Sequence, residues 1–212
     1  MRPVHELVLL LVVLTDFWVL GTSRLSSAIR ATALQGLLLA ALPIALHRTV
    51  SVHMMALAAG TLIVKAIVLP RLLSGAIREA TERREVEPLM GFTTSMIFGA
   101  VAVALSFGIA PRLPLPGLQS EMLIPVALST VMIGLVVLTT RSKAVTQVVG
   151  YLLLENGIYV FGLSQAQRVP FLVEVGVLLD VFAGVFVMGI VVFQINREFD
   201  SIDTNRLSEL GD

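Results

Sequence analysis

Five ionisable residues lie inside long apolar stretches of the chain, and they are the residues that could carry chemistry: Asp16, Lys65, Glu155, Glu174 and Asp180. A charge at the centre of a membrane-spanning helix costs about 2.5–3.5 kcal/mol on insertion scales, and function is the usual reason to keep one there. Carboxyl and amino groups at that depth can pair, or take up and release protons. They therefore predict proton or ion transfer rather than chemistry on a bound substrate.

The spacing around Glu155 places two tyrosines on the same helix face. Tyr151, Glu155 and Tyr159 stand at i, i+4 and i+8, and the chain has only 2 tyrosines. Their hydroxyls could hydrogen-bond the carboxyl or an adjacent chain of water molecules. The alternative is that both tyrosines fill packing space with satisfied hydroxyls.

Asp180 lies between two glycines on one predicted helix face, Gly176 and Gly184. Glycines at this spacing let a neighbouring helix or water approach the carboxyl closely. Ordinary helix packing through small residues is the other interpretation, and both can hold together.

Lys65 is the one cation among the 15 lysines and arginines that we expect deep inside a span. A buried lysine keeps its charge most readily beside a carboxylate, so Glu155, Asp180 and Asp16 are its candidate partners. A static ion pair that fixes helix register is the competing interpretation. Glu174 could instead face water at the outer surface, and Asp16 could be a packing residue bonded to the backbone or to a Ser or Thr side chain.

Other kinds of site have no support in the sequence. Without cysteine, the chain can hold no iron–sulfur cluster or thiolate metal site, and His5, His47 and His53 are too scattered to predict another metal centre. Phosphate-binding glycine loops and Ser/His/Asp arrangements are absent. We expect no catalytic residue and no cofactor in this chain, and a formal net charge of zero gives no indication of nucleic-acid binding.

The elements that must position these residues are transmembrane helices. The chain of 212 residues is 56% hydrophobic and 14% charged, with a mean hydropathy of +0.91, and in lipid only helices or closed barrels satisfy their own backbone. The sequence predicts an all-α polytopic membrane protein with about seven spans, the first of them a retained helix rather than a cleaved signal peptide. The predicted spans are 4–22, 30–47, 53–73, 90–109, 121–140, 143–164 and 170–196.

Loop charges predict the orientation. Lysines and arginines, Arg30 and Arg141 among them, collect in connections that share one side if the N-terminus is outside and the C-terminus inside, in line with the positive-inside rule. The clearest break is the proline-rich stretch 111–117. The longest polar link, 74–88, could form an amphipathic surface helix.

Three segments of the C-terminal part resemble the subunit K family of complex I and the related antiporter C subunits: GYLLLENGIY (150–159), EVGVLLD (174–180) and SIDTNRLSEL (201–210). Over its whole length the chain resembles the hydrogenase-4 component E family of group 4 nickel–iron hydrogenase and formate hydrogenlyase-type complexes. The resemblance implies two parts, namely four N-terminal transmembrane helices in 1–119 and a three-helix subunit-K-like module with a cytoplasmic tail in 120–212.

The resemblance also implies roles. Glu155 matches the glutamate of the family's second helix, Asp180 fits the acidic residue of the third, and Glu174 is the alternative match there. Lys65 and Asp16 have no counterpart in subunit K. The implied partners are antiporter-like and subunit-H-like membrane subunits in the lipid bilayer of a prokaryotic inner membrane, with the hydrophilic hydrogenase arm contacted indirectly.

Four functions fit the sequence to different degrees. The first is an accessory membrane subunit that contributes buried carboxyls to proton translocation or coupling in a hydrogenase complex. The second is a subunit of a multisubunit cation/proton antiporter without a redox partner. A purely structural spacer would not need buried carboxyls, and a stand-alone transporter would be expected to show internal repeats.

Overall fold

The computed structural model describes residues 2–46, 52–79, 89–113 and 120–165, together with positions 179, 182, 184–186, 188 and 189. These residues form helices and no β-strand. In chain order the elements are α1 (Arg2–Gly21), α2 (Leu25–Leu46), α3 (Val52–Thr61), the π-helical η1 (Leu62–Val68), α4 (Leu69–Glu79), α5 (Phe92–Ile109), the short 3-10 helix η2 (Ala110–Arg112), α6 (Leu123–Thr140) and α7 (Ala144–Gln165).

Six of the predicted spans are present as helices long and apolar enough to cross a membrane. The third is built from α3, η1 and α4, which follow one another without a break because Thr61 and Leu69 at the two junctions keep helical backbone angles. The prediction of an all-α polytopic membrane protein is confirmed. The seventh predicted span, 170–196, lies almost entirely outside the described residues, so the number of seven stays a prediction.

Two predicted boundaries were wrong. The second span was placed at 30–47, whereas α2 begins at Leu25 and Arg30 lies in its second turn. An exposed arginine is tolerated there because its long side chain can carry the charge toward the interface. The third span was ended at residue 73, but α4 continues to Glu79, so the beginning of the predicted 74–88 link extends a membrane helix and does not form a separate surface helix.

The π-helical segment has a local cause. Pro70 stands two residues after Val68, the last residue of η1. A proline inside an α-helix can neither donate a backbone hydrogen bond nor avoid a clash with the carbonyl four residues earlier. The backbone accommodates this with a wider turn, in which the Leu69 N–H donates to the Val64 carbonyl five residues back. Such π turns are rare and often coincide with functional positions. Lys65 stands at the middle of η1.

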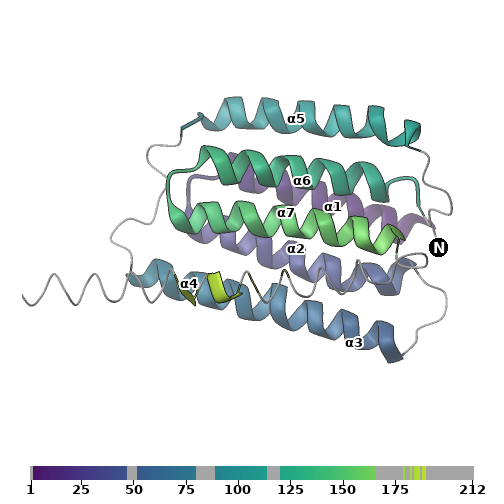
Figure 1. The fold of residues 1–212 in the computed structure, drawn as a ribbon, viewed down its shortest axis with the longest axis horizontal. Helices are drawn as coiled ribbons and strands as arrows, with labels where there is room; N and C mark the ends of the chain where they lie inside the picture. The colour runs from purple at the N-terminus through teal and green to yellow at the C-terminus, as the bar shows by residue number, and fades with distance from the viewer. Residues whose placement is uncertain are drawn as a thin grey trace, which may run out of the picture.

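The helices are arranged around a central pair (Figure 1). α6 and α7 pack along each other, and α1 and α2 lie against them. On one side α5 contacts α6 and α1, and on the other side the continuous α3–η1–α4 helix contacts α2. Because η1 and α7 both pack against α2, the middle of η1 lies close to the middle of α7.

The contact between α6 and α7 depends on three glycines. A Cβ atom added to Gly134 would collide with the backbone nitrogen of Leu154, and one added to Gly150 would collide with that of Leu138. Gly157 is similarly close to Val131. Because lipid gives no hydrophobic drive for helices to associate, close backbone approach through small residues is a main source of attraction. These glycines therefore fix the position of α7.

We expect Gly134→Ala to destabilise the protein, because its methyl group would collide with the backbone of α7. Overpacking of this kind costs about 1–3 kcal/mol. The matched control is Gly108→Ala in α5, where a Cβ atom would meet nothing within 4 Å, and which should raise stability by about 0.5–1 kcal/mol through helix propensity. Thermal unfolding of the two purified variants in mild detergent measures both effects. Equal stability of the two variants would contradict the close α6–α7 contact.

Candidate functional site

The centre of the candidate site is an ion pair between Lys65 of η1 and Glu155 of α7. The Lys65 Nζ atom lies 3.0 Å from the Glu155 Oε1 atom, and the two side chains are only 4% and 1% exposed. Of the three carboxyls considered as partners of Lys65, Glu155 contacts it directly, whereas Asp180 lies outside the described residues. The pair stands near the middle of both helical segments and thus at mid-membrane depth.

Close packing holds the lysine against α2. A Cβ atom added to Gly36 of α2 would lie 2.8 Å from both the carbonyl carbon and the Cβ atom of Lys65. Only glycine therefore lets the backbone of η1 approach α2 this closely. The glycines between α6 and α7 position the backbone of Glu155 from the other side. Close backbone contacts therefore hold both members of the pair in place.

Tyr159 and Thr61 extend the site by one helical turn. The Lys65 Nζ atom lies 5.8 Å from the centre of the Tyr159 ring, within the range of a cation–π interaction. The Thr61 hydroxyl donates to the Tyr159 hydroxyl oxygen at 3.4 Å. Tyr151, the other predicted supporting residue, is half-buried and packs against the apolar core.

A second polar cluster, the Asp16 cluster, joins four helices at similar depth. The Gln35 amide of α2 donates to Asp16 Oδ1 of α1 at 2.7 Å, and the Thr130 hydroxyl of α6 donates to Asp16 Oδ2 at 2.7 Å. The Asn156 amide of α7 donates to the Gln35 side-chain oxygen, also at 2.7 Å. All four side chains are buried. In the described part of the chain Asp16 is thus held by neutral donors, and the suggestion that it pairs with Lys65 was wrong.

The ion pair and the Asp16 cluster are connected through consecutive residues. Glu155 and Asn156 are neighbours on α7, and Gln35 and Gly36 are neighbours on α2. A rotation of either helix would therefore disturb both polar groups together. Sequence reasoning missed Gln35, Asn156 and Thr130, although two amides inside apolar spans could have been found by the depth criterion applied to the charged residues.

Arg141 was predicted as a loop residue, but its side chain is buried, with the residue only 1% exposed. Its guanidinium donates to the Leu20 carbonyl at the end of α1 at 2.8 Å and to the Met90 carbonyl at 3.5 Å, and it lies 4.5 Å from the centre of the Phe92 ring. It ties the end of α1 to the start of α5, far along the helices from the ion pair, and is a structural residue.

Glu174 and Asp180 lie outside the described residues, so their places in the site stay predictions. Within the described ranges no three His, Asp or Glu side chains gather closely enough to hold a metal ion. What the described site offers chemically is one exchangeable ion pair beside hydroxyl groups, and a hydrogen-bonded cluster around Asp16 next to it.

We expect the Asp16 cluster to show coupled energetics. Gln35→Leu leaves one Asp16 oxygen and the Asn156 amide without their partner, at about 1–3 kcal/mol for each buried group. Asn156→Leu removes one of the same bonds, so the double variant should lose less stability than the two single losses added. Thr32→Val is the control, because the Thr32 hydroxyl donates only to carbonyls of its own helix. Combined with Asn156→Leu, it should give additive losses of stability. Strict additivity of the Gln35→Leu and Asn156→Leu losses in unfolding measurements would contradict a shared network.

Comparison with known proteins gives relatives by sequence. The chain is 34% identical over 205 residues to an uncharacterized protein of Mycobacterium tuberculosis, covering 94% of this chain and 92% of that protein. It is 30% identical over 155 residues to hydrogenase-4 component E of Escherichia coli K12, covering 72% of this chain and 71% of the relative, and equally similar to that of Shigella flexneri. No family model and no solved structure matches. On this identity and coverage, the chain belongs to the hydrogenase-4 component E family.

Proposed function

We propose that this protein is a membrane subunit of a hydrogenase-type complex and that its Lys65–Glu155 pair takes part in proton transfer or in coupling. The observation that carries the proposal is the 3.0 Å contact between these two buried side chains at mid-membrane depth. Family membership supports the complex, since the relatives are named as a component of hydrogenase-4. The chain itself is proposed to have no active site and to act in the cytoplasmic membrane.

The chemistry of the pair suits a relay. A lysine ammonium beside a carboxylate and a neutral amine beside a carboxylic acid carry the same net charge, so moving the proton between Nζ and Oε1 leaves no unbalanced charge in lipid. Adding or removing one proton does leave a net charge, and an opposite charge nearby favours that state. A change of charge in a neighbouring subunit could thus set the protonation of the pair.

Hydroxyl groups extend the proposed relay along the helix axes, that is, across the membrane. Thr61 and Tyr159 lie one turn from Lys65 and Glu155 respectively, on the same side of the pair in the direction of the α7 C-terminus. A hydroxyl both donates and accepts, so it can pass a proton without becoming charged. We infer that Glu174 and Asp180 continue the pathway, and that the Asp16 cluster fixes helix positions beside it.

The wider arrangement belongs to the same proposal. The N-terminus lies outside and the C-terminus inside, and 120–212 forms a subunit-K-like module appended to four helices in 1–119. Antiporter-like and subunit-H-like proteins are the proposed membrane neighbours, and the hydrophilic hydrogenase arm is reached through them.

Purification of the tagged protein from its native membrane tests the partners. We expect mass spectrometry to identify a nickel–iron hydrogenase large subunit together with antiporter-like subunits. Antiporter-like subunits without any redox protein would instead assign the chain to a cation/proton antiporter, and a protein that purifies alone would contradict membership in a complex.

Three variants of the pair separate a relay from a static ion pair. Lys65→Met and Glu155→Gln each break the buried ion pair by removing one of its charges, a change that costs about 3–5 kcal/mol. The double variant removes both charges and should regain most of that stability and assemble. If the pair moves protons, the assembled double variant should still lose about a hundredfold in translocation, the lower end of what a positioned proton-transfer group contributes.

Proton uptake by inverted membrane vesicles, normalised to the amount of assembled complex, is the readout. Asp180→Asn and Glu174→Gln in the same assay report whether these carboxyls belong to the pathway. Normal translocation by the assembled double variant would mean that Lys65 and Glu155 only fix helix register, and the proposal for this pair would be wrong.

A further inference from the structure

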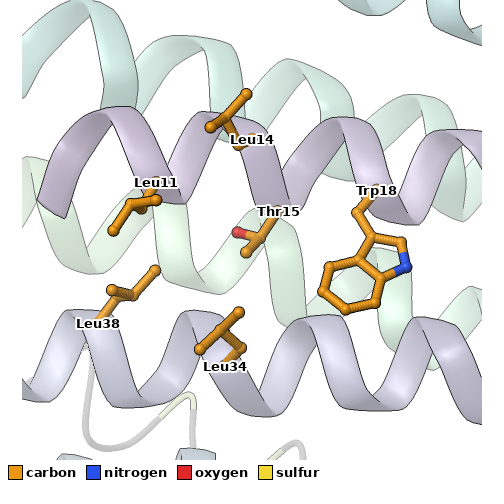
Figure 2. Close-up of a pocket in the computed structure, with 6 residues that line it drawn as sticks. All are labelled: Leu11, Leu14, Thr15, Trp18, Leu34 and Leu38. Atoms are coloured by element: carbon orange, nitrogen blue, oxygen red, sulfur yellow. The ribbon is translucent and has the colours of Figure 1, made fainter. Parts of the chain in front are cut away.

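A groove between α1 and α2, on the lateral surface of the helix bundle, is not used by the proposed relay. Its volume is about 210 Å³, and Figure 2 shows its lining residues, which are Leu11, Leu14, Thr15 and Trp18 of α1 and Leu34 and Leu38 of α2. Leu14 is 54% exposed and Trp18 46% exposed. The groove therefore opens on the part of the helix bundle that the described chain leaves uncovered.

The groove presents an apolar surface to its occupant. The Trp18 indole N–H already donates to the Ser27 hydroxyl at 2.9 Å, and the Thr15 hydroxyl donates to the Val12 carbonyl at 2.7 Å. Both polar atoms of the lining are thus engaged inside the protein. Whatever fills the groove meets leucine side chains and the face of an indole ring, which suits a hydrocarbon chain.

One end of the groove is positively charged. Arg30 stands one helical turn before Leu34 on the same face of α2, and Arg24 lies in the turn that joins α1 to α2. Both side chains are exposed, and in the described part of the chain neither forms an ion pair. Trp18 stands one turn from the end of α1, where tryptophan commonly marks the membrane–water interface. The two cations therefore lie at headgroup level.

We propose that this groove binds an anionic phospholipid, with one acyl chain between Leu11 and Leu38 and the phosphate beside Arg24 and Arg30. The order of the groove, apolar at depth and cationic at the interface, matches the order of such a lipid from tail to headgroup. A helix of another subunit would need an acidic residue at the level of the two arginines to match it equally. The charge complementarity thus favours the lipid.

Trp18 makes this site measurable, because it is the chain's single tryptophan. The full-length protein is reconstituted in phosphatidylcholine vesicles that contain a small fraction of either brominated phosphatidylglycerol or brominated phosphatidylcholine, and quenching of tryptophan fluorescence is recorded. We expect an apparent preference for the anionic lipid of at least about fivefold, since each arginine near an anionic headgroup contributes about that factor. Equal quenching by the two lipids would overturn the proposal.

Charge variants identify the headgroup site. Arg24→Gln combined with Arg30→Gln should abolish the preference, whereas Arg112→Gln, which removes an exposed arginine in η2 after α5, should keep it. Retention of the preference by the double variant would overturn the site. Inorganic phosphate added to phosphatidylcholine vesicles should leave the quenching unchanged, and a response to phosphate without any lipid preference would assign the arginines to a free anion instead.

The purified complex tests whether another protein fills the groove. Photoreactive phosphatidylglycerol with its label on the acyl chain is expected to modify the α1 and α2 segments that line the groove, as mapped by mass spectrometry. Absence of label there, with a crosslink from these segments to another subunit, would mean that a partner helix occupies the groove, and the lipid proposal would be wrong.

Discussion

The ion pair between Lys65 and Glu155 places a strict constraint on the helices that present it. Removing each charge from water costs several kcal/mol, and attraction offsets this only when the partners stay at hydrogen-bonding distance. A 3.0 Å separation between side chains on η1 and α7 therefore demands backbones that cannot slide. Gly36 keeps the backbone of η1 in place against α2, and the glycines between α6 and α7 keep the backbone of α7 in place against α6.

The Asp16 cluster meets a different need beside the pair. Helices in lipid gain little from burying apolar surface, so packing and hydrogen bonds must choose their neighbours. The four side chains of the cluster come from four helices, and each of the three hydrogen bonds among them joins two different helices. Because Gln35 and Asn156 immediately adjoin Gly36 and Glu155, the cluster sets the rotation of the two helices that present the ion pair.

Much of the fold could be predicted, because hydropathy reports which segments can sit in lipid. The six described spans follow from it to within a few residues, apart from the start of α2 and the end of α4, where arginines in the sequence hid the continuation of a helix. Depth along the helix also identified Lys65, Glu155 and Asp16 as ionisable residues far inside a membrane span. Their pairing could not be predicted, since it depends on which helices touch, and neither the proline-linked π turn of η1 nor the burial of Arg141 has a periodic signature in the sequence.

The contrast between the two polar groups bears on which of them can change during function. Asp16 is bonded to a threonine hydroxyl and a glutamine amide, in agreement with its interpretation as a packing residue, and a shift there would break contacts among four helices at once. Lys65 and Glu155 involve two helices, and a proton can move between them without a net charge appearing in lipid. A subunit that must keep its shape while responding to a neighbour would place the rigid contacts and the changeable pair in this way, on consecutive residues of the same helices.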